Sequence, residues 1–153
     1  MTKLLIVCMG NICRSPMAQA VFSKQLLDAG LSRKISVDSA GTHASRVGER
    51  PDPRADSALL RRGYSTGRIR SRKIEAEDFQ KFDLILAMDS DNLTSLRESC
   101  PAQFLAKIKL FLDFETLPID TDVPDPYYGN AQGFERVLDL CEAGAAGWLK
   151  RLR

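Results

Sequence analysis

The chain has 153 residues, of which 44% are hydrophobic and 27% are charged, and its formal net charge is +2. This is the composition of a soluble globular protein, and the length suits a single domain, residues 1–153, with a core of its own. The small net charge does not indicate a nucleic-acid partner, because domains that bind nucleic acid usually carry a strongly basic face. No apolar run is long enough to span a membrane.

Four cysteines bear on the compartment in which the protein works. They are Cys8, Cys13, Cys100 and Cys141. Their spacing is unlike that of a secreted scaffold held together by disulfides, and no signal-peptide cleavage site follows the short apolar run near the N-terminus. We therefore expect a cytoplasmic protein in a reducing environment. For the oligomeric state we expect a monomer or a weak dimer.

Apolar residues follow strand and helix patterns in alternation along the chain. Residues 3–7 form a short apolar run, typical of a strand that is covered on both faces. Pro16 and Pro53 suit the first turns of two helices, and Gly30 and Gly63 suit positions just after their last turns. The other strands are predicted at residues 35–37, 82–88 and 107–112, and the helices at residues 16–27, 53–62, 89–96 and 132–152.

This alternation predicts an α/β fold in a single domain. We expect an open four-stranded parallel sheet with helices on both faces, flavodoxin-like or Rossmann-like. In such a sheet the ligand lies at the carboxyl ends of the strands, near the point where the strand order reverses. Cys8 and Ser39 both fall at predicted strand ends. Residues 113–130 have no clear periodicity, and a long unpatterned loop in a compact domain is usually functional.

The most informative segment joins the first strand to the first helix. Residues 8–16 read Cys-Met-Gly-Asn-Ile-Cys-Arg-Ser-Pro. The backbone N–H groups of such a loop and the positive end of the following helix point at one site, which suits an anion. Cys8 lies beside that helix end and beside Arg14, surroundings in which a thiol ionises at neutral pH. Arg14 offers a planar fork to two phosphate oxygens, and the Ser15 hydroxyl can donate a hydrogen bond to the Cys8 sulfur.

These residues predict a phosphate site with a thiolate nucleophile. Its phosphate-binding residues are predicted to be Met9, Gly10, Asn11, Ile12, Cys13, Arg14 and Ser15. A zinc site is not indicated, because one histidine and no second cysteine pair supply no recognisable set of four ligands.

The chain resembles the low-molecular-weight protein tyrosine phosphatases, whose signature is Cys-x5-Arg-Ser at the extreme N-terminus. The resemblance covers nearly the whole chain. Outside the loop it extends over residues 39–42, 51–55, 87–89 and 123–128 and over the helix start at 133–137. Cys-x5-Arg alone is a loose pattern, but together with the Asp-Pro-Tyr element at residues 125–127 it is highly specific.

The resemblance implies hydrolysis of phosphotyrosine in a protein substrate, and of aryl phosphates, with no cofactor and no metal. Cys8 would attack phosphorus to form a phosphocysteine, while Arg14 and the loop amides stabilise the developing charge. Asp125 would protonate the departing phenolate and then activate water. Asn11 would hold the loop through a bond to Ser39.

The resemblance also implies which residues surround the substrate ring. They are Tyr127 and Tyr128, with Ile12 in the loop and Ser45 on the facing side. Relatives usually carry an aromatic residue where Ser45 stands, and many carry a histidine near Ile69. In relatives that have a cysteine at the position of Cys13, it protects the nucleophile from over-oxidation, so we expect a redox role for Cys13.

Several alternatives stay open. Arsenate reduction needs a relay of further cysteines late in the domain, and Cys100 has no partner cysteine several residues away, so the relay is incomplete. Phosphoarginine phosphatases carry threonine where Ile12 stands, and an apolar residue there favours an aromatic leaving group. A catalytically silent phosphate-binding module is disfavoured because Cys8, Arg14 and Asp125 are all present. Asp125 could also be a simple turn residue before a proline, and Cys13 a small buried hydrophobe.

A run of basic residues allows two interpretations. It comprises Arg61, Arg62, Arg68, Arg70, Arg72 and Lys73 and contains no acidic residue. It either attracts an anionic phosphoprotein towards the cleft or is an ordinary solvated loop.

Overall fold

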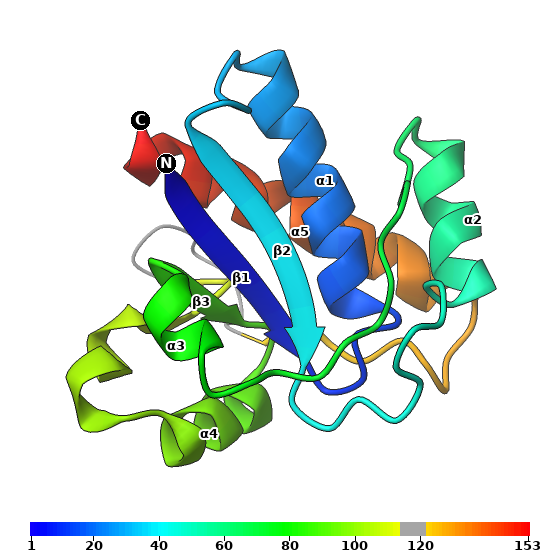
Figure 1. Cartoon of the computed structure of the whole chain (residues 1–153). Coiled ribbons are helices and arrows are strands. Elements are labelled where there is room, and N and C mark those ends of the chain that lie inside the picture. The colour runs from blue at the N-terminus through cyan, green and yellow to red at the C-terminus, as the bar shows by residue number, and fades with distance from the viewer. Residues whose placement is uncertain (114–121) are drawn as a thin grey trace.

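The computed structural model describes residues 1–113 and 122–153 (Figure 1). Its elements in chain order are β1 (Thr2–Cys8), α1 (Arg14–Asp28), β2 (Ile35–Gly41), α2 (Pro53–Arg61), α3 (Asp78–Lys81), β3 (Leu84–Ala87), α4 (Ser90–Ser99), the 3-10 helix η1 (Ala102–Lys107), β4 (Ile108–Leu110) and α5 (Ala131–Leu152). No helix in this part of the chain is long and apolar enough to cross a membrane.

The strands form one parallel sheet in the order β2-β1-β3-β4, which confirms the predicted fold class. β1 is central: Leu4 pairs with Val37 of β2 on one side and with Leu84 of β3 on the other. The chain therefore adds β2 on one side of β1 and β3 on the other, so the strand order reverses beside β1. Cys8 is the last residue of that strand, where a ligand is expected in an open parallel sheet.

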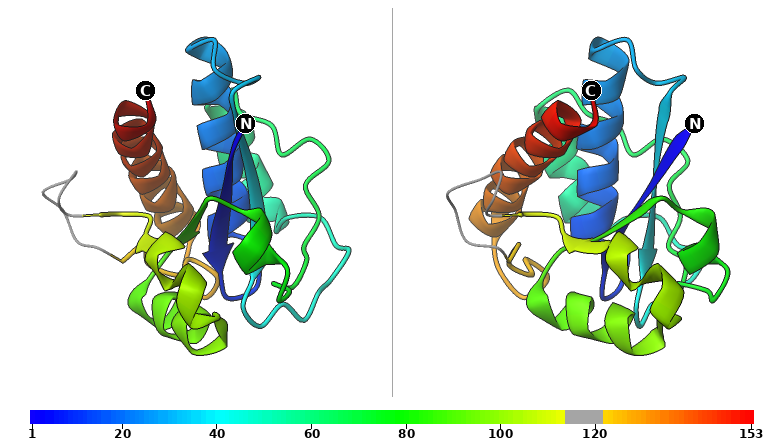
Figure 2. Two further views of the ribbon diagram at one scale, coloured as in Figure 1. Left: turned by 60° about the vertical axis from the view of Figure 1, so that its left-hand side comes forward. Right: turned by 90° about the vertical axis from the view of Figure 1, so that its left-hand side faces the viewer.

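Alternate residues of β1 pack into two separate core clusters. Leu4 and Ile6 face the layer formed by α1, α2 and α5, whereas Leu5 and Val7 face the layer of α3 and α4. Figures 1 and 2 show the first layer on one side of the sheet and the second on the other. All four side chains are fully buried, as expected of a strand covered on both faces.

Two short helical elements, α3 and η1, were not predicted. α3 ends at Lys81, just before the segment predicted as a strand at 82–88, and β3 begins only at Leu84. Asp83, the residue before β3, forms two hydrogen bonds with Lys3 of β1. Its N–H donates to the carbonyl of Lys3, and its carboxylate accepts the N–H of Lys3. The fourth strand is likewise shorter than the predicted 107–112, because η1 extends to Lys107.

The first helix begins two residues earlier than predicted. The N–H of Met17 donates to the carbonyl of Cys13, so Arg14 and Ser15 form the first turn and Cys13 is the N-cap residue. No side chain caps this helix. Its first N–H groups are therefore left for another acceptor, since the opening turn of a helix has no intrahelical partners for them. Of the predicted loop at 113–130, residues 114–121 lie outside the described residues.

Candidate active site

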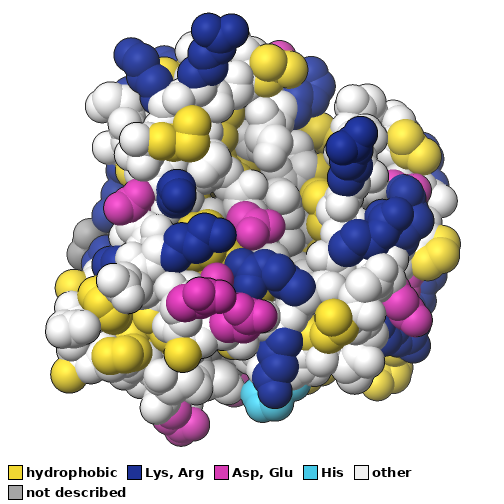
Figure 3. Space-filling view, viewed as in Figure 1, with side chains coloured by type: hydrophobic (Ala, Val, Ile, Leu, Met, Phe, Trp, Pro, Cys, Tyr) yellow, Lys and Arg dark blue, Asp and Glu magenta, His cyan; other side chains and the backbone are white. Residues whose placement is uncertain are grey.

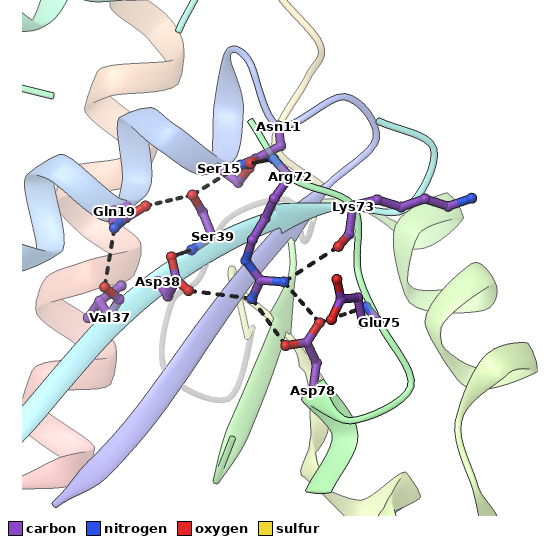
Figure 4. A network of polar contacts seen from close by, with 10 residues as sticks. All are labelled: Asn11, Ser15, Gln19, Val37, Asp38, Ser39, Arg72, Lys73, Glu75 and Asp78. Carbon is purple, nitrogen blue, oxygen red and sulfur yellow. Dashed lines mark hydrogen bonds and ion pairs between the residues drawn. The ribbon is translucent and has the colours of Figure 1, made fainter. Parts of the chain in front are cut away.

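Asn11 holds the predicted phosphate-binding loop in its shape. Its φ of 56° is the only positive value at a non-glycine residue in the described chain, and asparagine adopts this conformation more readily than most residues. Its side-chain oxygen accepts a hydrogen bond of 2.9 Å from the backbone N–H of Arg72. Its side-chain nitrogen donates to the hydroxyls of Ser15 at 2.8 Å and Ser39 at 3.0 Å (Figure 4). The amide thus ties the loop to the first helix, to β2 and to the segment after α2.

These contacts determine the direction of the neighbouring hydroxyl groups. The Asn11 nitrogen can only donate, so the Ser15 oxygen accepts from it and directs its own proton to the Cys8 sulfur, 3.0 Å away. The backbone N–H of Asn11 also donates to this sulfur at 3.3 Å. Two donors at one sulfur stabilise a negative charge on it. By the same logic Ser39 donates onward to the side-chain oxygen of Gln19 at 2.6 Å.

Arg14 is fixed by contacts at both of its terminal nitrogens. Nη1 donates to the carboxylate of Asp89 and, at 3.0 Å, to the carbonyl of Val123, while Nη2 lies 3.7 Å from the carboxylate of Asp125. Burial alone would lower the pKa of Arg14, but attraction to Cys8, Asp89 and Asp125 outweighs it and raises the pKa above its ordinary value. Arg14 is therefore a permanent cation beside Cys8.

Asp125 lies at the mouth of the site, and its side chain is 38% exposed. One carboxylate oxygen accepts the backbone N–H of Tyr127 at 3.0 Å, and the other faces Arg14. Its segment is joined to the sheet by a hydrogen bond of 2.7 Å from the N–H of Val123 to the carbonyl of Met88, just after β3. Asp125 is therefore close to the phosphate loop and still open to water.

One cavity of about 200 Å³ collects most of the predicted site residues. It is lined by Cys8, Met9, Gly10, Ile12, Cys13, Arg14, Ser45, Arg46, Asp125, Tyr127 and Tyr128. Asn11, Ser15 and Ser39 are buried behind the loop and do not line it. In the described part of the chain, no group of three or more His, Cys, Asp or Glu side chains is arranged to hold a metal ion.

Tyr127 is held by two arginines. Arg46 donates a hydrogen bond of 2.9 Å to its hydroxyl, and the guanidinium of Arg54 lies 5.3 Å from the centre of its ring. Arg54 is itself held by Asp52 through two side-chain hydrogen bonds. Tyr128 packs edge-on against Tyr127, with 4.9 Å between ring centroids, but is 93% exposed. Of the two tyrosines that line the cavity, Tyr127 is thus the one held in place.

The second cysteine of the loop, Cys13, has a strongly raised pKa. Burial, together with the negative charges of Asp52, Cys8 and Asp125, raises the pKa of the Cys13 thiol to about 12. Cys13 is therefore a neutral thiol at physiological pH.

Several residues of the site were missed in the sequence. Arg72 and Ser71 brace the loop from behind, since the Ser71 hydroxyl donates to the carbonyl of Gly10 at 3.0 Å. They do so in the region where many relatives have a histidine and this chain has Ile69. Asp89 was placed at the start of the helix predicted at 89–96 and given no role in the site, although its place directly after a strand was a signal for one. Gln19 and Arg46 gave no signal in the sequence.

The basic run does not form a continuous cationic surface. Arg62 pairs with Glu135, Asp139 and Glu142, and Arg72 pairs with Asp38 and Asp78. On the face shown in Figure 3, Lys and Arg side chains lie next to Asp and Glu side chains. Arg61 also lies 3.9 Å from the carboxylate of Glu135. Three of the six cations thus form ion pairs with acidic side chains, which favours the interpretation as an ordinary surface segment.

With this geometry established, comparisons with known proteins are decisive. The sequence model of the low molecular weight phosphotyrosine protein phosphatases matches residues 3–153. The chain belongs to this family. It is therefore an enzyme of the protein-tyrosine-phosphatase class, a group of hydrolases.

Individual relatives agree over almost the whole length. The low molecular weight protein-tyrosine-phosphatase of Streptomyces coelicolor is 40% identical, over 99% of this chain and 93% of its own. The crystal structure of a protein tyrosine phosphatase from Entamoeba histolytica, with Hepes in its active site, superposes with a TM-score of 0.95 at 43% identity, covering 99% of this chain and 97% of that one. The YwlE arginine phosphatase is more distant, with a TM-score of 0.89 and 26% identity over 99% of this chain and 95% of its own.

A glycine outside the loop is predicted to be essential for its position. A Cβ atom at Gly41 would lie 2.6 Å from the carbonyl oxygen of Met9 and 3.1 Å from the Cβ of Ala44. We expect Gly41→Ala to displace the loop and to lower kcat/KM for an aryl phosphate by about 100-fold, the cost of a displacement near 1 Å. Steady-state kinetics measure this loss, and circular dichroism checks that the variant is folded.

The matched control is the double variant Gly41→Ala, Ala44→Gly. It relieves the contact with the Ala44 side chain but leaves the closer contact with the Met9 backbone, so activity should stay low. Full activity of folded Gly41→Ala would contradict the proposed close fit between β2 and the loop.

Proposed function

We propose that the protein hydrolyses phosphotyrosine in proteins, and aryl phosphates, through a phosphocysteine intermediate. The observation that carries this proposal is the meeting of Cys8, Arg14 and Asp125 in one cavity with Tyr127 at its wall. A nucleophile, a phosphate clamp and a proton donor are the groups this reaction needs. Membership of the family supports the same substrate class.

In the first step the Cys8 thiolate attacks phosphorus. The sulfur–phosphorus bond forms as the bond between phosphorus and the phenolic oxygen breaks, and Asp125 gives its proton to that oxygen. Arg14 and the loop N–H groups bind the equatorial oxygens, where donors held in place beforehand stabilise the charge of the transition state. The first-turn N–H groups of α1, which no side chain caps, belong to the same set of donors.

In the second step water replaces the enzyme at phosphorus. Asp125, now a carboxylate, takes a proton from the water, whose oxygen forms a bond to phosphorus while the sulfur–phosphorus bond breaks. The Ser15 hydroxyl, 3.0 Å from the sulfur, stabilises Cys8 as it leaves as a thiolate. Inorganic phosphate is released and the resting enzyme returns.

The walls of the cavity favour an aromatic leaving group. Ile12 and Tyr127 offer apolar surface to a ring, and Ser45, an exposed residue at the rim, leaves one side of the cleft open. Phosphoarginine hydrolysis is the nearest alternative, and the apolar Ile12 argues against it. Arsenate reduction is disfavoured because Cys100 packs against the core cluster of α3 and α4, whereas Cys8 belongs to the cluster on the other face.

We further propose that the protein works in the cytoplasm. The proposal rests on the chemistry of Cys8, since only the reduced thiolate can attack phosphorus. A reducing compartment keeps such a thiol in its active form.

Replacing Asp125 should slow the reaction selectively. We expect Asp125→Asn to lower kcat/KM for phosphotyrosine by about 100- to 10,000-fold, the usual contribution of general acid–base catalysis. The kcat/KM for an activated phenyl phosphate should fall much less, because its leaving group departs without a proton. Steady-state kinetics on the two substrates measure the ratio. Equal losses on both substrates would remove Asp125 from the role of acid.

Cys13 is proposed to protect the nucleophile from over-oxidation. Peroxide oxidises the Cys8 thiolate to a sulfenic acid and is itself reduced to water. The Cys13 thiol then attacks the Cys8 sulfur, which forms a disulfide and releases water. Cys13 and Cys8 line the same cavity. Oxidation of Cys8 also removes a negative charge that raises the pKa of Cys13, so the resolving thiol becomes more acidic when it is needed.

The variant Cys13→Ser tests this role. It should keep most of the activity but recover poorly when thiol is added after treatment with peroxide, because Cys8 proceeds to irreversible oxidation states. Activity recovery and mass spectrometry of the oxidised protein measure the outcome, with Cys100→Ser as the matched control that should recover like the parent. Full recovery of Cys13→Ser, or absence of a Cys8–Cys13 disulfide in the oxidised parent, would contradict the role.

A further inference from the structure

The hydrogen bonds between Asp122 and Ser90 join the segment that carries Asp125 to the start of α4. One carboxylate oxygen of Asp122 accepts two hydrogen bonds from Ser90, one from its backbone N–H at 3.0 Å and one from its hydroxyl at 2.8 Å. Ser90 is the first residue of α4, where the N–H groups have no partner within the helix and a negative charge is favourable. The contact between Asp122 and Ser90 therefore combines two hydrogen bonds with a negative charge at a helix N-terminus, where such a charge is favourable.

The residue next to Ser90, Asp89, holds Arg14. Asp89 caps α4 by accepting the N–H of Asn92 at 2.7 Å, and it also binds Arg14. At this one helix end, Asp89 thus contacts Arg14, and the next residue, Ser90, contacts the segment that carries Asp125. A shift of this helix end would move Arg14 and the segment that carries Asp125 together.

Only two residues separate Asp122 from Asp125, and one of them is anchored as well. Val123 is fully buried; its N–H binds Met88, and its carbonyl accepts from Arg14 at 3.0 Å. Pro124 follows, and its ring fixes one of the backbone dihedrals that lead to Asp125. The backbone entering Asp125 is therefore defined from Asp122 onward.

Asp125 itself has few contacts that could fix it. Its carboxylate accepts the N–H of Tyr127, two residues on, and lies 3.7 Å from Arg14, which must also bind the phosphate. We propose that the Ser90–Asp122 pair positions Asp125 for proton transfer to the leaving group. Asp122 and Ser90 are positioning residues and do not touch the substrate. This inference rests on the proposed role of Asp125 as the acid.

The test compares variants of Asp122 on two substrates. Asp122→Ala removes both hydrogen bonds and should lower kcat/KM for phosphotyrosine about 10-fold, with a smaller loss on an activated phenyl phosphate. Asp122→Asn keeps an oxygen that can accept both bonds and should restore most of the activity. Asp91→Ala, which removes an exposed carboxylate from the same first turn of α4, is the matched control and should behave like the parent.

A double variant separates positioning from a general structural effect. In the Asp125→Asn background the acid is already absent, so adding Asp122→Ala should cause no further loss on phosphotyrosine. The inference is overturned if Asp122→Ala has the same kcat/KM for phosphotyrosine as the parent, or if its kcat/KM falls equally for both substrates. It is also overturned if Asp122→Asn loses as much activity as Asp122→Ala, or if Asp122→Ala lowers activity further in the Asp125→Asn background. Equal losses for Asp125→Asn alone would instead refute the proposed acid, and the inference with it.

Discussion

The hydrogen bonds of the Asn11 side chain are the interaction on which the rest of the site depends. A loop that turns its N–H groups towards one anion needs a residue with positive φ and a support on its outer side. Asn11 supplies both, because its amide is bound by the N–H of Arg72 and by the hydroxyls of Ser15 and Ser39. Its orientation determines that Ser15 donates to Cys8. The proposed nucleophile is thus oriented and stabilised by a residue that does not line the cavity.

A second set of contacts makes the proposed catalytic groups interdependent. Arg14 is bound by Asp89 after β3 and by the carbonyl of Val123, and it lies close to Asp125. The carboxyl ends of β1 and β3 are neighbours in the sheet, so residues far apart in the sequence meet at this edge. A parallel sheet whose strand order reverses beside β1 brings this about without any long side chain having to reach across the molecule.

The sequence predicted the parts that depend on local pattern. The apolar run of β1, the loop that follows Cys8 and the parallel α/β order followed from periodicity and from the chemistry of thiol and guanidinium. The missed parts depend on tertiary contacts. Arg72 contributes its backbone N–H to the loop, which no residue type could have signalled, and α3 is a single turn of four residues, too short to show a helical pattern in the sequence. Asp89 could have been recognised from its place at a strand end.

The central claim is that Cys8 carries the phosphoryl group during turnover. The most direct measurement is mass spectrometry of the protein denatured rapidly during turnover of an activated aryl phosphate, for which hydrolysis of the intermediate is the slower step. The account predicts one phosphoryl group on Cys8 in the parent and no turnover by Cys8→Ser. Turnover in the parent without modification of Cys8, or a phosphoryl group on a different residue, would contradict it.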